Sequence, residues 1–402
     1  MDRHLQFDDG RIWVARVRTP GPNYLAGGEK MLEPEACLKS EIANATFLKK
    51  SSSIPIQTVY GFDLGVTDEV GGPYVLFEHV GETTANELRV LRNGNDSNMY
   101  GTREQDKKFR QKLAEIQAEL ATFTFGSIGS LTCHERSLTW EERTQNYFIG
   151  PELRTGKGPW TCSTEYFKAL ANHELSACKD SGMRNVISRP SHLLPREFRH
   201  LMELYSYECP PASQKYHLMD QKLGADNLLV DEDFNIVGFL EWDGIMAAPI
   251  QQVVQYPRKT GFSMPPPGKK HVDMRDIERL MFTEKRRAEY LTMLKRAEQG
   301  GAVKISDDMH MVGATIMQGL VRYGDHVWDR TAPPGLSPWY NTPETLGWDL
   351  RDEEYVRVND MWFEEYHRLV LVGVVAEPKN YDDDDDDDTS SESSGSTREI
   401  VD

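Results

Sequence analysis

The amino-acid sequence changes character near residue 80, and this change limits the folds open to the chain. Before that point, residues 4–17 hold two β-rich runs around the turn Asp8–Gly10, and residues 54–63 and 71–80 hold two more. An Asp-Gly turn between such runs favours an antiparallel hairpin. Residues 34–50 carry an apolar stripe at helical spacing. We expect a small sheet with one helix packed across it.

Beyond residue 80, long amphipathic segments predict helices. The clearest covers Lys107 to Phe123, where apolar residues recur at steps of three and four. One strand pair interrupts the helices, because the apolar runs 227–230 and 236–242 flank a polar turn. The same periodicity predicts further helices near 163–179, 196–207, 273–298, 307–323 and 352–371.

Negative charge is concentrated at the carboxyl end of the chain. The formal net charge of the 402 residues is -18, and residues 381–402 supply half of it with ten acids against Arg398. The rest is only mildly acidic, so it lacks the basic surface typical of proteins that bind nucleic acid or an anionic membrane. We predict neither partner. Residues 379–402 are too polar to pack, which predicts a disordered acidic tail.

The sequence favours a cytoplasmic address. Its longest apolar run, Leu369–Ala376, is too short to cross a bilayer. The first ten residues lack the apolar core of a signal peptide. The five cysteines are odd in number, widely spaced and without a CxxC pair, which predicts reduced thiols.

Segment 216–249 holds the residues best suited to chemistry. A loop ending in Asn227 leads into a tight hairpin, whose second strand ends in Glu241, Trp242 and Asp243. Phosphoryl transfer requires Mg²⁺ held against the phosphates and an acceptor hydroxyl whose proton is removed. A loop asparagine and a carboxylate across a hairpin can hold that metal together.

This segment resembles the phosphotransferase family that includes aminoglycoside phosphotransferases and choline kinases, especially its fungal branch. The family loop reads HGDLxxxN, and its hairpin strand ends in IDW. On this pattern the two metal ligands fall on Asn227 and Glu241. The catalytic aspartate falls on Lys222, and the loop histidine falls on Asp220.

The resemblance extends over about residues 5–260. FDDGRIWVARV resembles the family's FxDGxxWVxR strand pair, which assigns a phosphate-contacting base to Arg16. LKSEIANATFLKK resembles the helix whose glutamate pairs with that base, which assigns Glu41. The implied α+β fold is the bilobal protein kinase-like fold. It has a small β-rich N-terminal lobe over 1–80 and a larger, mainly helical C-terminal lobe over 81–378.

The resemblance also implies cofactors and a substrate. These are ATP and Mg²⁺, with phosphate transferred to a hydroxyl of a small molecule. Only Met1–Phe7 precede the first turn. The family's additional strand and glycine-rich loop are therefore missing, or the sequence begins after them.

Two of the three chemical positions depart from the family pattern. An aspartate at position 222 would take and steer a proton, which is worth about 10² to 10⁴ in rate. Lys222, with an ordinary pKa of about 10.4, places a cation there. Glu241 keeps its charge but adds a methylene, which weakens an octahedral Mg²⁺ site. We interpret the chain as a pseudo-phosphotransferase. An active kinase using Asp220 or Asp243, and a protein-interaction scaffold, are the alternatives.

Each site residue also has an ordinary structural explanation. Asn227 suits a turn that opens a strand. Arg16 suits a sheet edge with its stem along apolar neighbours, and Glu41 suits the first half of a helix. Solvent exposure is the ordinary state of the remaining candidates, Lys222, Glu241, Asp220, Asp226 and Asp243.

Overall fold

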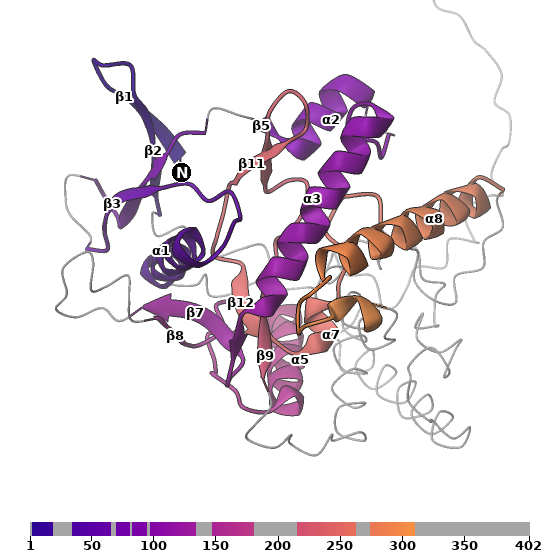
Figure 1. Cartoon of the computed structure of the whole chain (residues 1–402). Coiled ribbons are helices and arrows are strands. Elements are labelled where there is room, and N and C mark those ends of the chain that lie inside the picture. Colours follow the sequence, from indigo (N-terminus) through magenta and orange to yellow (C-terminus); the bar gives the residue numbers. More distant parts are fainter. Residues whose placement is uncertain are drawn as a thin grey trace, which may run out of the picture.

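The computed structural model contains both helices and sheets (Figure 1), as the predicted α+β class requires. The residues that it describes are 2–18, 34–65, 70–80, 83–94, 97–133, 147–180, 215–262 and 274–309. The predicted helices at 196–207 and 352–371 and the predicted acidic tail lie outside these ranges.

The first sheet has four antiparallel strands in the order β1-β2-β4-β3. The strands β1 (Asp2–Gln6) and β2 (Ile12–Val17) form the predicted hairpin, with Leu5 opposite Trp13. The strands β3 (Val59–Asp63) and β4 (Tyr74–Glu78) form the second predicted pair. Both strand pairs predicted for the first 80 residues are therefore confirmed.

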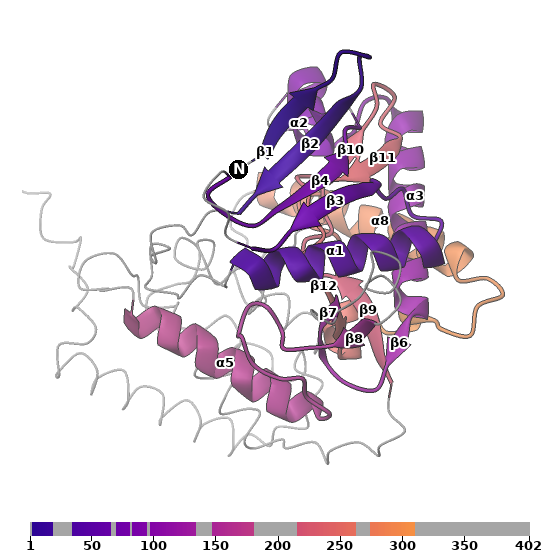
Figure 2. The ribbon, with the colours of Figure 1, turned by 90° about the vertical axis from the view of Figure 1, so that its left-hand side faces the viewer.

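Helix α1 (Pro34–Ser51) lies between this sheet and a second one (Figure 2). Its predicted apolar stripe is fully buried, as Leu38 and Leu48 show. Polar contacts also hold the helix in place. Ser40 Oγ donates to the Leu131 carbonyl at 3.0 Å, and Asn44 Nδ2 donates to the Trp242 carbonyl at 2.6 Å. The helix therefore fixes the first sheet relative to the rest of the described chain.

The second sheet was not predicted. It has five strands in the order β6-β9-β12-β7-β8, so the prediction that one strand pair interrupts the helices after residue 80 is wrong. These strands are short, and β12 is buried at every position, so they lack the polar and apolar alternation that identifies a strand. Their bounds are β6 Thr124–Phe125, β7 Gly129–Cys133, β8 Tyr147–Ile149, β9 Tyr216–Asp220 and β12 Ile245–Ala248.

The predicted hairpin around residues 231–235 is confirmed. It consists of β10 (Leu228–Val230) and β11 (Ile236–Phe239), and β5 (Thr83–Thr84) pairs with β10 as a third strand. The Asp231 side chain closes the turn, because it accepts hydrogen bonds from the backbone N–H groups of Asp233 and Asn235. Segments 216–227 and 240–249 therefore meet at the open end of the hairpin.

The remaining regular elements of the described chain are helical. The predicted helices α3 (Arg103–Thr122), α5 (Ser163–Asp180) and α8 (Met274–Ala297) are confirmed, and α8 packs beside α3 (Figure 1). The additional elements are α2 (Ala85–Asn93), α7 (Ile250–Val253) and the 3₁₀ turn η1 (Ile305–Asp307). No α-helix begins at Asp307 within the described residues, and the rest of that predicted helix lies beyond them.

Two observations bear on the cellular address. No helix in the described ranges is long and apolar enough to cross a membrane. Cys162 is disulfide-bonded, so the prediction of five reduced thiols is wrong at this position. Because disulfides are rare in reducing compartments, the cysteines no longer support the cytoplasmic prediction.

Candidate functional site

Lys222 lies between two carboxylates at the open end of the β10–β11 hairpin. Its Nζ is 2.5 Å from Glu241 Oε2 and 2.7 Å from Asp243 Oδ1. The second sheet creates this arrangement, since β9 and β12 are neighbours with Asp220 opposite Ile245. The loop that follows β9 therefore lies beside the segment that precedes β12. The sequence placed Lys222 and Glu241 in one site, and the structure brings them into direct contact.

The cluster is open at one end and buried at the other. The side chains of Lys222 and Glu241 are 38% and 39% exposed, whereas that of Asp243 is only 9% exposed. Burial acts to raise the pKa of Asp243, but Lys222 and Arg18 outweigh it and lower that pKa. Burial likewise acts to lower the pKa of Lys222, yet Asp243 and Glu241 raise it. Lys222 is therefore a protonated ion-pair partner.

Two arginines connect this cluster to the first sheet. Arg18 Nη2 is 3.1 Å from Asp243 Oδ2 and 3.4 Å from Glu41 Oε2. Arg16, from β2, forms an ion pair with Glu41 of α1, as the sequence predicted. Burial raises the pKa of Glu41, and the two arginines oppose that rise. We call the resulting set the charge network. Its members are Arg16, Arg18, Glu41, Lys222, Glu241 and Asp243.

Asp220 supports the loop that holds Lys222. Asp220 is buried, with 3% of its surface exposed, and its Oδ1 accepts a hydrogen bond from the Lys222 backbone N–H at 2.8 Å. Its Oδ2 atom is buried without a hydrogen-bond partner in the described chain. Burial raises the Asp220 pKa to about 7. A Cβ at Gly244 would lie 2.6 Å from Asp220 Oδ1, so the close packing of the two loops requires glycine there.

Asn227 is fixed to the hairpin through its backbone. Its carbonyl accepts the Leu240 N–H at 2.8 Å, and its N–H donates to the Gly224 carbonyl at 3.0 Å. Its side-chain Nδ2 is buried and has no partner among the described residues. The backbone of Asn227 is therefore held beside Leu240, the residue that precedes Glu241.

Solvent exposure, the ordinary explanation for the loop residues, holds for Asp226 and for Glu241, whose side chain is 39% exposed. Asp226 is exposed and pairs with Lys259 at 2.6 Å. Asp220 is buried and the Asp243 side chain is only 9% exposed, so that explanation is wrong for both. The Lys222 side chain is 38% exposed, but its ammonium also makes two ion pairs, so exposure describes this residue only in part.

Sequence reasoning missed two residues at this site, and a periodic signal was present for each. Arg18 follows Arg16 by two positions, the spacing that places side chains on one face of a strand. Cys37 precedes Glu41 by four positions, the spacing that places them on one face of a helix. Burial raises the pKa of the Cys37 thiol, and Arg18 and Lys222 act to lower it.

The donor set does not fit Mg²⁺ in this arrangement. Mg²⁺ takes oxygen ligands in near-octahedral order, and in proteins one or two of them are usually carboxylate oxygens that are free to bind it. Glu241 and Asp243 are both bonded to the Lys222 ammonium, and Asp243 also contacts Arg18. The described residues contain no group of three His, Cys, Asp or Glu side chains that could hold a metal ion. A divalent ion would have to displace Lys222.

Comparison with known sequences gives short matches. No family model matches the chain. The subtelomeric hrmA-associated cluster proteins of two Aspergillus fumigatus strains are 26% identical to it over 153 residues. The match covers 37% of this chain and 26% of each relative, so it spans about a quarter of their length.

The chain is similar in structure to aminoglycoside and macrolide phosphotransferases. Macrolide 2'-phosphotransferase type I matches 90% of this chain and 86% of its own, with 12% identity and a TM-score of 0.38. A putative aminoglycoside phosphotransferase from Ralstonia eutropha JMP134 matches 92% and 93%, with 12% identity and a TM-score of 0.40. A mutant of aminoglycoside phosphotransferase APH(4)-Ia, in a complex with AMP-PNP and hygromycin B, matches 81% and 95%, with 15% identity and a TM-score of 0.39. Because these TM-scores are below 0.5, no residue role is transferred from them.

Proposed function

We propose that this chain is a degenerate phosphotransferase of the fungal branch, a pseudo-phosphotransferase that retains the kinase-like fold as a binding module. The observation that supports this most is the position of the Lys222 ammonium, 2.5 Å from Glu241 and 2.7 Å from Asp243. Residues 1–80 form the N-terminal lobe of the proposed bilobal fold, residues 81–378 the C-terminal lobe, and 379–402 an acidic tail.

The site lacks a proton acceptor at the position where the family resemblance requires one. A general base must have a free lone pair within hydrogen-bond reach of the acceptor hydroxyl. Lys222 is protonated, because its acidic neighbours raise its pKa. Its two carboxylate partners are themselves engaged by its ammonium. Because the ammonium holds one oxygen of each carboxylate, this trio is poorly suited to remove the proton of a bound hydroxyl.

The same ion pairs disfavour a magnesium–nucleotide complex. Three cationic and three carboxylate side chains make up the charge network, so the cations are already neutralised by the acids. Arg16, the predicted phosphate contact, is 6% exposed and bonded to Glu41. Phosphate binding would have to compete with each of these pairs. We therefore expect no measurable binding of a magnesium–nucleotide complex to the wild-type protein.

Thermal-shift titration with ATP and Mg²⁺ tests the proposal. The melting temperature of the wild-type protein is expected to stay unchanged, since only a ligand bound by the native state raises it. Lys222→Asp removes the ammonium and supplies a third carboxylate, so this variant is expected to gain a shift with Mg²⁺ or Mn²⁺. Lys222→Met is the matched control, because it removes the charge without adding a ligand.

Phosphoryl transfer by the wild-type protein would contradict the proposal. The measurement is Mg²⁺-dependent phosphate transfer from labelled ATP to a panel of small alcohols and amino sugars. A wild-type shift with Mg²⁺ and ATP that Lys222→Met abolishes would contradict it as well, because Lys222 would then act in nucleotide binding.

An active small-molecule kinase is the second candidate, and one observation favours it. Asp220 has a pKa near 7, which suits a general base at neutral pH. If Asp220 replaces the missing base, the labelled-ATP assay will detect transfer by the wild-type protein and none by Asp220→Asn.

A further inference from the structure

A small cavity lies behind the candidate site, between α3, β9 and segment 250–257. Three side chains in its lining are more than nine-tenths buried, with exposed fractions of 3% for Asp220, 1% for Gln252 and 5% for Gln255. Each of them has a polar atom without a hydrogen-bond partner in the described part of the chain. These atoms are Asp220 Oδ2, Gln252 Nε2 and Gln255 Nε2.

The rest of the lining does not satisfy these atoms. Gln117 also faces the cavity, but its Nε2 donates to the Val253 and Gln255 carbonyls, and its Oε1 accepts from Tyr290. Gln252 is oriented by the Tyr166 hydroxyl, which donates to Gln252 Oε1 at 3.0 Å. This contact leaves the amide nitrogen of Gln252 as the atom that needs a partner.

The chemistry of the three atoms identifies their ligand. Two amide N–H groups require an acceptor, and one carboxylate oxygen requires a donor. A metal cation does not bind amide N–H groups, and an anion is repelled by Asp220. The cavity has room for a single water molecule, and buried waters usually bridge polar groups of this kind. We propose that one buried water binds here and joins Asp220 Oδ2 to Gln252 Nε2 and Gln255 Nε2.

This water would position Lys222 through Asp220. One Asp220 oxygen holds the Lys222 backbone N–H, and the water would hold the other oxygen against segment 250–257. The charged groups that act on Asp220 are Lys222, in its own loop, and Glu241 and Asp243, in the facing loop. The side chains from α3 and from segment 250–257 that line the cavity are uncharged. Asp220 is therefore a positioning residue in this proposal.

The variant Gln255→Met separates a hydrated cavity from a dry one. It removes an amide donor with little change in volume. If the water is present, the melting temperature falls by about 2–4 °C per lost hydrogen bond at pH 8. The loss is smaller at pH 6, since a protonated Asp220 has less need of a donor. In a dry cavity, the same change removes an unpaired buried amide and raises the melting temperature at both pH values.

Gln111→Met is the matched control, because Gln111 lies on α3 outside the cavity lining and its amide donates to the Glu115 carboxylate on the same helix. Its melting temperature is expected to stay within about 1 °C of the wild-type value. A crystal structure at better than 2 Å resolution gives an independent test if Gln255→Met does not fold. Electron density within hydrogen-bond distance of the three atoms supports the proposal, and an empty or metal-filled cavity overturns it.

Discussion

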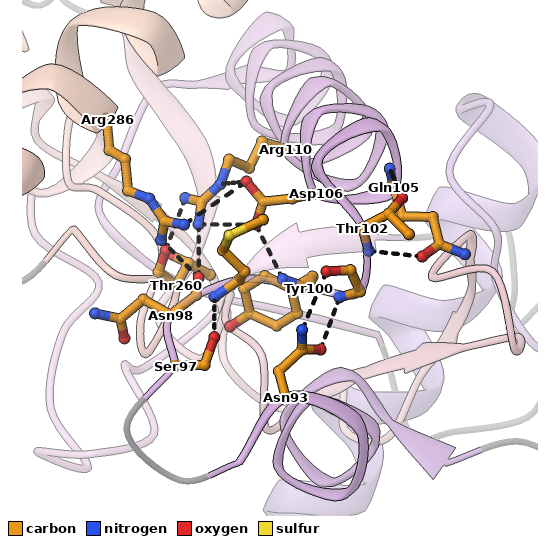
Figure 3. A network of polar contacts seen from close by, with 12 residues as sticks. Asn93, Ser97, Asn98, Tyr100, Thr102, Gln105, Asp106, Arg110, Thr260 and Arg286 are labelled. Carbon is orange, nitrogen blue, oxygen red and sulfur yellow. Dashed lines mark hydrogen bonds and ion pairs between the residues drawn. The ribbon is translucent and has the colours of Figure 1, made fainter.

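Two clusters of charged side chains in this protein differ in the groups that pair with their cations. Arg110 and Arg286, on α3 and α8, share one carboxylate, Asp106, at 2.9 and 3.8 Å (Figure 3). Their remaining contacts include backbone carbonyls, since Arg110 donates to Thr260 and both arginines donate to Asn98. In the charge network, by contrast, side-chain carboxylates are the partners of the cations.

This difference separates a structural tie from a candidate site. Main-chain carbonyls cannot leave Arg110 and Arg286 without unfolding of the loops that hold them. Burial and the repulsion of Arg110 lower the pKa of Arg286 to about 10, so the tie remains charged at neutral pH. The charge network ends in the exposed pair Lys222 and Glu241, where a ligand can replace a side chain. We conclude that the type of group that pairs with a cation, a backbone carbonyl or a side-chain carboxylate, indicates where a ligand can bind better than burial alone does.

Arg110→Met is expected to have the largest effect on stability. It removes the nearer of the two arginines that contact Asp106, one of the two donors to the Asn98 carbonyl, and the arginine donor to the buried Thr260 carbonyl. Breaking a buried ion pair in this way costs about 3–5 kcal/mol. Urea denaturation measures the free energy of unfolding. The control is Arg103→Met at the exposed start of α3, which should cost less than about 0.5 kcal/mol. A loss below about 1 kcal/mol for Arg110→Met would show that the tie is not structural.

Lys222→Met is expected to cost less, about 1–2 kcal/mol. It leaves Asp243 without one partner, but Arg18 still contacts that carboxylate at 3.1 Å. Solvent reaches Glu241 and reduces its share of the loss. Lys259→Met, which breaks the exposed pair with Asp226, is the control and should change stability by less than about 0.5 kcal/mol. Equal costs for Lys222→Met and Arg110→Met would remove the distinction between the two clusters.

The sequence predicted the parts of the site that follow a local pattern. The family resemblance assigned Arg16 and Glu41, on a strand and a helix that periodicity predicted, and the hairpin came from its polar turn. Burial of Asp243 and Asp220 did not follow from the sequence, because it depends on the unpredicted second sheet. The strand β12 is too short and too uniformly apolar to distinguish from a buried helix segment. The ion pairs of Lys222 required knowledge of that sheet.

The arginine tie was missed for a similar reason. The spacing of Asp106 and Arg110 suggests an ordinary pair on one helix. Nothing in the sequence indicates that Arg286, far along the chain, donates to the same carbonyl as Arg110. Contacts that join distant segments through backbone atoms leave no periodic signal, since any residue type supplies a carbonyl.

The effect of Asp220→Asn is expected to depend on pH in both size and sign. The pKa of Asp220 is about 7 in the folded protein and about 3.9 in an unfolded chain. Between these values the native state binds more protons, so the contribution of Asp220 to stability falls as pH rises from about 4 to 7. Asparagine does not titrate. The unfolding free energy of Asp220→Asn should therefore depend less on pH over this range. The stability of the variant relative to wild type should be highest at pH 8. Urea denaturation at pH 5, 6, 7 and 8 provides the measurement. Parallel pH profiles for the two proteins would mean that Asp220 is ionised throughout and well solvated. Asp220 would then be an exposed acid of the loop, and not a buried residue that supports Lys222.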